Sequence, residues 1–147
     1  MRAADIRRYG DRYVLHAWSL TTVGVWLATP PYIAVPCDCD AIKLADALRE
    51  AFSGSKEGVP HPTEFKGGMK PLLDLAGKKT VRAYENSAVT ASVEEDNGVL
   101  RFCPSANRGK DGHVPVDNAE FQIPVESSAE TIGNAILRAL DLSAKAK

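Results

Sequence analysis

Residues 93 to 102 specify a β-hairpin and read Val93-Glu94-Glu95-Asp96-Asn97-Gly98-Val99-Leu100-Arg101-Phe102. Asn-Gly tolerates the positive φ angles of a type I′ turn, so positions 97 and 98 form a two-residue loop between two strands. Closing the turn there sets Val93 opposite Phe102 and Glu94 opposite Arg101. One pair is apolar and the other carries opposite charges, as cross-strand neighbours favour. The chain therefore contains an antiparallel ladder at this point.

Other stretches also have the composition of strands. The segment from Tyr13 to Leu27 is rich in β-branched and aromatic residues, which indicates two strands joined by a short turn. Trp18 and Trp26 lie within these patterns, and we expect both in the core. Similar composition predicts strands at residues 32–35, 80–84, 87–94 and 119–125.

Two segments show helical periodicity. Apolar residues recur at helical spacing from 41 to 52, after Asp38 and Asp40, either of which can cap the first turn. The second helix is predicted from Ser127 to about Leu142, where Ser127 and Glu130 have the spacing of a capping box. A single helical turn is expected at residues 71–75.

The order of elements is therefore strands, helix, loop, strands, helix. Short hairpin connections predominate, which favours an α+β fold with a largely antiparallel sheet and two main helices packed on one face. The 147 residues are enough for a single domain, 1–147, that buries a core without disulfides or metal.

Composition narrows the function classes. The formal net charge is −1, from 18 basic and 19 acidic residues, which argues against a dedicated nucleic-acid binder but leaves a local basic patch open. No apolar run is long enough for a signal-peptide core or a membrane span. The three cysteines are an odd, sparse set that fits a reducing compartment, so we expect a cytoplasmic protein without membrane contact.

No recognisable catalytic or metal-binding motif emerges. Cys37 and Cys39 have Cys-x-Cys spacing, and the aspartates beside them more simply begin a helix, so no metal and no cofactor are expected. His16 alternates with apolar strand residues and is expected to be half-buried and satisfied, while His61 and His113 are expected in exposed loops. A small cytoplasmic enzyme that uses Cys103 or a histidine stays open as an alternative, because the fold could bring the two together.

Three loop or turn regions are candidates for binding a partner. The segment from Ser53 to Pro71 is rich in glycine, proline and charge, and connections of this length are often functional. Residues 94–97 form an acidic hairpin tip, and residues 108–113 form a glycine-rich basic loop that lacks the P-loop pattern. Within these regions the charged candidates for contact are Glu57, Glu64, Lys66, Glu94, Glu95, Asp96, Arg108 and Lys110.

Two further stretches carry a family resemblance. Residues 13–27 read Tyr-Val-Leu-His-Ala-Trp-Ser-Leu-Thr-Thr-Val-Gly-Val-Trp-Leu, and residues 123–140 read Ile-Pro-Val-Glu-Ser-Ser-Ala-Glu-Thr-Ile-Gly-Asn-Ala-Ile-Leu-Arg-Ala-Leu. Together they resemble CdiI, the immunity proteins of bacterial contact-dependent growth inhibition, over about a quarter of the chain.

The resemblance implies a small cytoplasmic protein that binds and neutralises the C-terminal toxin domain of a partner CdiA protein, with no turnover of its own. Such toxins are often nucleases. It implies a protein partner and no direct contact with nucleic acid. A chaperone-like or adaptor domain with a peptide partner is a third hypothesis.

Overall fold

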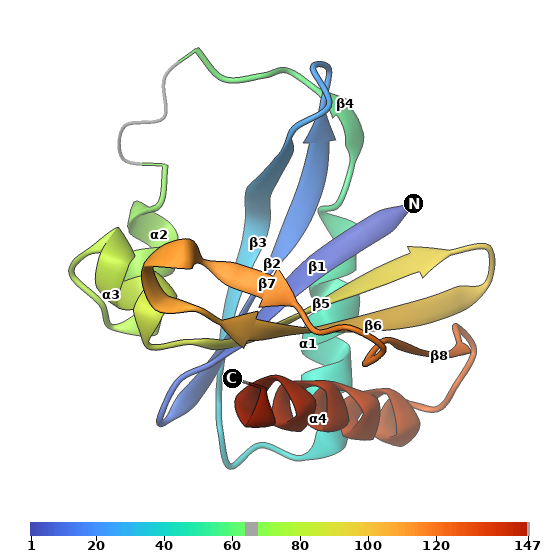
Figure 1. Ribbon diagram of the computed structural model, residues 1–147. Helices are drawn as coiled ribbons and strands as arrows, with labels where there is room; N and C mark the ends of the chain where they lie inside the picture. Colours follow the sequence, from blue (N-terminus) through green and yellow to red (C-terminus); the bar gives the residue numbers. More distant parts are fainter. Residues whose placement is uncertain (64–67, 147) are drawn as a thin grey trace.

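The computed structural model describes residues 1–63 and 68–146, which form eight strands and four α-helices (Figure 1). The strands are β1 (Arg2–Arg8), β2 (Arg12–Thr21), β3 (Trp26–Pro36), β4 (Glu57–Val59), β5 (Val89–Asp96), β6 (Val99–Asn107), β7 (His113–Pro115) and β8 (Phe121–Pro124). The helices are α1 (Ala41–Ser53), α2 (Lys70–Ala76), α3 (Val81–Asn86) and α4 (Ala129–Lys145), with a 3₁₀ turn, η1 (Gly109–Asp111), between β6 and β7.

The sheet is largely antiparallel, as the sequence predicts. Its strand order is β3-β2-β1-β5-β6-β7, with β8 also paired to β6 and β4 paired in parallel to β2. The predicted hairpin register is confirmed, because Val93 faces Phe102 and Glu94 faces Arg101 across β5 and β6. The α+β class is therefore correct.

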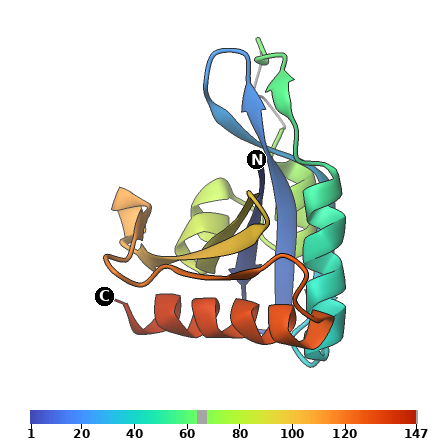
Figure 2. The same cartoon turned by 90° about the vertical axis from the view of Figure 1, so that its right-hand side faces the viewer.

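The two long helices pack on one face of this sheet and enclose the main core. Residues on alternate positions of the central strands meet apolar residues of α1 and α4, among them Ile6, Leu15, Val93, Phe102, Leu44, Leu48, Ile136 and Leu140. The N-terminal ends of α1 and α4 meet (Figure 2), and a Cβ added at Gly133 would lie 2.0 Å from the carbonyl oxygen of Ala41. Glycine at this position therefore allows the two helices to touch.

The opposite face of the sheet is covered only in part. The short helices α2 and α3 pack on it around a second apolar cluster of Tyr9, Val14, Leu72, Ala76, Tyr84 and Ala88. Apart from this cluster, the face lies open beyond α2 and α3 along the N-terminal end of β1 and the neighbouring part of β5. The sequence predicts the two main helices but not this second, partial layer.

Two predictions of local structure are wrong. Residues 80–84, expected as a strand, begin helix α3, because the Thr80 hydroxyl caps it by accepting the Ala83 N–H at 3.1 Å. The capping residue of α4 is Ser128, whose hydroxyl accepts the Thr131 N–H at 3.1 Å, and not Ser127.

Other local predictions hold in full or in part. Asp40 caps α1, where its Oδ1 accepts the Lys43 N–H at 2.8 Å, and α2 occupies the predicted helical turn after residue 70. The prediction of a loop from residue 53 to 71 is wrong in part, because strand β4 lies within this segment and α2 begins at Lys70. None of the described helices is long and apolar enough to cross a membrane.

Candidate functional site

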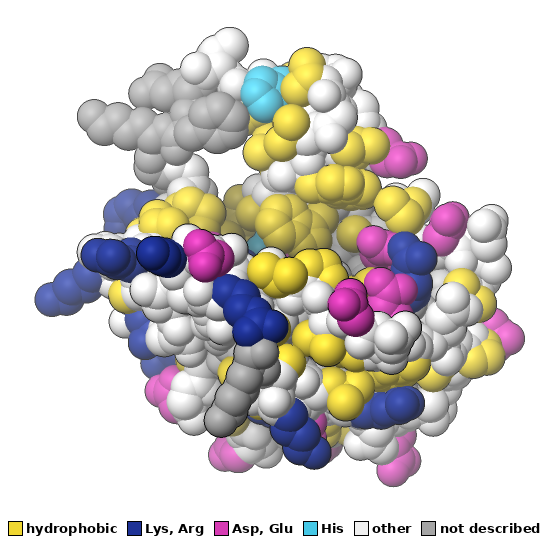
Figure 3. Space-filling model, in the orientation of Figure 1, with side chains coloured by type: hydrophobic (Ala, Val, Ile, Leu, Met, Phe, Trp, Pro, Cys, Tyr) yellow, Lys and Arg dark blue, Asp and Glu magenta, His cyan; other side chains and the backbone are white. Residues whose placement is uncertain are grey.

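A hollow of about 270 Å³ opens on the uncovered part of the second sheet face. It is lined by Ala3, Trp18, Trp26, Ser92 and Glu94, and we call it the tryptophan hollow. Hydrophobic side chains gather in a recess at the centre of this side of the molecule (Figure 3). At the end of the β2–β3 hairpin, Val23 and Val25 add exposed apolar surface. Exposed apolar surface with a polar rim is typical of a docking site for another protein.

Both tryptophans are held in place by the strands that carry them. Trp18 lies on β2 between the small residues Ala3 on β1 and Ala28 on β3, which leaves room for its indole. The imidazole of His16 meets the Trp18 ring edge-on, with the centroids 4.8 Å apart. The tryptophans were expected in the core; that prediction is wrong, since both are partly exposed where neither helical layer covers the sheet.

The segment after α1 braces the strands behind the hollow. The Ser55 hydroxyl donates to the Trp18 carbonyl at 2.6 Å and accepts the Ala3 N–H at 2.9 Å. A Cβ added at Gly54 would lie 2.0 Å from the Pro30 carbonyl oxygen, so only glycine permits this close approach to β3. These contacts fix the hollow's walls before any partner binds.

The predicted acidic tip does not form a single patch. Successive strand residues point to opposite faces, so Glu94 lines the hollow whereas Glu95 lines a separate recess on the helical side. Glu94 is paired with Arg101 and Glu95 with Arg2. Asp96 is exposed at the turn. The hollow therefore has one carboxylate in its wall, already neutralised by an arginine.

The other predicted contact residues lie elsewhere. Glu57 is on β4, with a carboxylate oxygen 3.9 Å from the N-terminal amino group. Arg108 and Lys110 belong to the η1 region, which follows the C-terminal end of β6. The nine residues of β6 span about 26 Å, so this region lies about that far from the hairpin tip at the other end of the strand. Glu64 and Lys66 lie outside the described residues.

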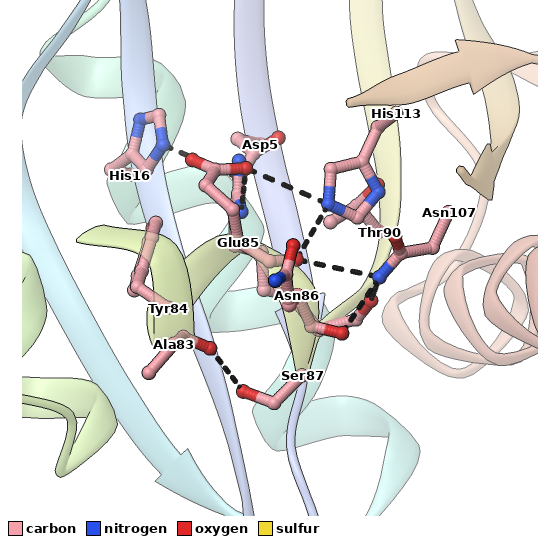
Figure 4. A network of polar contacts seen from close by, with 12 residues as sticks. Asp5, His16, Ala83, Tyr84, Glu85, Asn86, Ser87, Thr90, Asn107 and His113 are labelled. Atoms are coloured by element: carbon pink, nitrogen blue, oxygen red, sulfur yellow. Dashed lines mark hydrogen bonds and ion pairs between the residues drawn. The ribbon is translucent and has the colours of Figure 1, made fainter. Parts of the chain in front are cut away.

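A buried ionic network lies beside the hollow, beneath α3 (Figure 4). Asp5 Oδ2 accepts from Arg7 Nε at 2.7 Å and lies 3.3 Å from His16 Nε2, and Arg7 continues to Glu85 at 3.0 Å. Burial alone would raise the pKa of Asp5, but the charge of Arg7 and then His16 outweigh it and hold that pKa well below its usual range. Asp5 therefore stays ionised inside the sheet face.

The same network fixes α3 to the strands. His113 Nδ1 is 3.0 Å from the Thr90 hydroxyl, and its Nε2 is 3.0 Å from the Glu85 carbonyl oxygen. Asn107 Nδ2 lies within 3.3 Å of the carbonyl oxygens of Glu85, Asn86 and Ala88. The prediction that His113 lies in an exposed loop is wrong, because it belongs to β7 and is only partly exposed. His16 is satisfied, as predicted, but it is fully buried and not half-buried.

The pKa values of the three cysteines do not favour the enzyme alternative that uses Cys103 as a nucleophile. Burial, followed by Glu120 and Glu94, raises the pKa of the Cys103 thiol, which favours the unreactive protonated form. Burial is also the first cause that raises the pKa values of Cys37 and Cys39. Among the described residues, no group of three or more histidine, cysteine or acidic side chains could hold a metal ion.

Comparison with known proteins assigns the chain to a family. The family model described as CdiI, CDI immunity protein, matches residues 2–143, which is nearly the whole length. The chain belongs to this family. It is thus an immunity protein of contact-dependent growth inhibition, and the resemblance read from the sequence is confirmed. A search of curated proteins finds no match.

Two solved structures resemble this CDI immunity protein in fold. One is NMB0488 from Neisseria meningitidis, a protein of unknown function, with a TM-score of 0.79, 20% identity, and 96% of this chain and 94% of that chain covered. The other comes from a CdiA-CT/CdiI toxin and immunity complex of Yersinia pseudotuberculosis, with a TM-score of 0.77, 14% identity, and 95% of each chain covered. At these identities the likeness shows the shared fold.

Proposed function

We propose that this CDI immunity protein binds the C-terminal toxin domain of a cognate CdiA protein in the cytoplasm and neutralises it by covering part of its surface. Membership of the family supports a protein partner and a role in binding rather than catalysis. The Yersinia pseudotuberculosis relative of the same fold comes from a complex of toxin and immunity protein, which supports a toxin domain as that partner.

The tryptophan hollow is the observation that carries the proposed docking surface. Tryptophan is enriched among the residues that dominate binding energy, particularly in recesses that a partner can fill and desolvate. Both tryptophans of the chain line this one hollow, and the contacts of Ser55 and Gly54 hold its walls in place. A preformed recess lowers the entropy cost of binding.

Charged groups around the hollow are proposed to orient the toxin domain. The Glu94–Arg101 pair at its wall and the exposed Asp96 at the hairpin tip offer a mixed polar rim, which suits a partner with both basic and polar groups. Glu57 on β4, near the N-terminal end of β1, is a further rim candidate. Glu95 points to the other face, and its contact with the toxin stays a prediction, as do those of Glu64 and Lys66.

The experiment is co-purification with the CdiA toxin domain encoded immediately upstream, followed by calorimetric titration and a toxicity assay in cells. We expect a one-to-one nanomolar complex and restored growth of cells that express the toxin domain. Expression of the chain with a toxin domain from another CdiA serves as the specificity control. Failure to form a complex, or a complex that leaves toxicity unchanged, would contradict the proposal.

A further inference from the structure

A single row of side chains connects the tryptophan hollow to a polar part of the same sheet face. Opposed residues of antiparallel strands point to the same face, so the pairing of β3, β2, β1, β5, β6 and β8 sets this row. Its members in that order are Ala28, Trp18, Ala3, Glu94, Arg101 and Gln122. The apolar half of the row lies on β3, β2 and β1, and the polar half lies on β5, β6 and β8.

A second hollow, of about 140 Å³, lies on the polar half and shares Glu94 with the tryptophan hollow. The rest of its lining consists of Asp96, Asn97, Val99, Arg101 and Gln122. The side chains that line the two hollows therefore carry two carboxylates and one guanidinium.

Negative charge exceeds positive charge on this polar part. Glu94, through its hydrogen bond and its charge, and then Glu120 raise the pKa of Arg101, so both carboxylates act on the same guanidinium. Among the described residues, Asp96 and Glu120 have no ion-pair partner, and both are exposed. Acidic side chains gather beside the apolar recess in Figure 3. This surface therefore favours a partner of positive potential.

Glu94 retains capacity for a further hydrogen bond at the wall of the tryptophan hollow. Arg101 Nη2 donates to its Oε2, and within residues 1–63 and 68–146 no donor is bound to its Oε1. An apolar partner side chain that filled the hollow would exclude water from this oxygen without replacing the hydrogen bond. An acidic side chain would face like charges at Glu94 and Asp96. A side chain with an apolar stem and a cationic end avoids both costs.

We propose that a lysine or arginine side chain of the toxin domain fills the tryptophan hollow and binds Glu94 through its cation. Its methylene groups pack against the indoles of Trp18 and Trp26, which also attract a cation through their π electrons. This contact rests on the proposed function, because the toxin domain supplies the cation.

Calorimetric titration with the CdiA toxin domain encoded immediately upstream tests this contact. Glu94→Gln keeps the shape of the side chain and should lower the affinity at least about tenfold, because the cation loses its carboxylate. Arg101→Met should bind at least as tightly as the native chain, because Arg101 then no longer competes for Glu94. The matched control is Asp141→Asn, which removes a carboxylate paired with Arg8 on the helical side of the sheet and should change the affinity by less than about twofold.

The same titration identifies the partner residue. Each lysine and arginine of the toxin domain is replaced by alanine in turn. One of these toxin variants should lose at least about tenfold in affinity for the native chain but less than about threefold for the Glu94→Gln chain, because both changes remove the same contact. Thermal unfolding checks that every variant is folded.

Two results would overturn this contact: an affinity of Glu94→Gln within about twofold of the native value, or no toxin cation whose loss is coupled to Glu94. If Trp18→Ala weakens the complex in either case, the docking surface stands and the hollow holds an apolar side chain instead. Absence of any complex with the native chain would contradict the proposed function itself.

Discussion

Replacing Asp5 by asparagine should destabilise the protein by about 3 kcal/mol, because it leaves the Arg7 charge partly uncompensated inside the sheet face. Removal of one partner of a buried ion pair costs about 3–5 kcal/mol. Arg7 keeps its contact with Glu85 at 3.0 Å, and the Glu85 side chain is 35% exposed, so the cost should lie at the lower end of that range.

Urea unfolding followed by circular dichroism measures this cost. With a slope of about 2 kcal/mol per molar urea, the midpoint should fall by about 1.5 M. The control is Asp11→Asn, which removes an exposed carboxylate paired with Arg12 and should leave the midpoint within error of the native value. Adding Arg7→Met to Asp5→Asn should recover part of the loss, because the stranded charge is then removed as well.

The same network gives a pH dependence with a definite sign. The pKa of Asp5 is lower in the folded than in the unfolded protein, so its stabilisation is fully present above the unfolded pKa of about 3.9 and is lost as the pH falls towards the folded value. Native stability should therefore drop more than that of Asp5→Asn between pH 7 and pH 3. A cost of Asp5→Asn below about 1 kcal/mol, or parallel pH profiles, would refute this view of the network.

Three further substitutions test other parts of the structure. Gly133→Ala should lower the free energy of unfolding by about 1–3 kcal/mol, because its Cβ would clash with the Ala41 carbonyl and this cost exceeds the gain from alanine's higher helix propensity. The control Asn134→Ala changes a neighbouring exposed residue and should not destabilise the protein, and thermal unfolding of both variants measures the difference. Trp18→Ala and Trp26→Ala should each lower the affinity for the toxin domain, measured by calorimetry, by at least about thirtyfold. The control Ile42→Ala changes an exposed residue of α1 and should leave the affinity unchanged. Equal losses of affinity in the tryptophan variants and the control would show that the hollow is not part of the interface. Cys103→Ser should protect cells from the toxin as well as the native chain does, because the raised pKa of Cys103 disfavours the thiolate; lost protection with intact binding would revive the enzyme alternative.

The sequence alone predicted the hairpin and the two long helices, because each of these elements is specified by residues close together in the chain. The Asn97-Gly98 turn fixes its own register, and the apolar stripes of α1 and α4 need only helical spacing to be visible. Strand β1 was not predicted, because the charged residues Asp5 and Arg7 give its sequence the composition of a polar surface segment. Their burial is possible because they pair with each other and because His16 and Glu85, distant in the chain, supply further opposing groups.

The tryptophan hollow could not be predicted from the sequence, because it forms through packing between residues that are far apart in the chain. Trp18 and Trp26 have the pattern of core residues, and their exposure follows from the limited area that α2 and α3 cover. The run Glu94-Glu95-Asp96 looks like one acidic cluster, but strand alternation divides it between two faces. Tryptophans spaced eight residues apart around a turn were the one available signal, and they indicated strands without indicating which face stays open.

The most direct test of the central claim uses the chain's two tryptophans, both of which line the hollow. The protein is labelled with 5-fluorotryptophan and titrated with the unlabelled CdiA toxin domain while its two ¹⁹F resonances are recorded. The account predicts that both resonances shift and that the shifts saturate at one equivalent of toxin domain. Unchanged resonances under conditions in which the two chains elute as a complex would contradict it, because the toxin would then bind elsewhere.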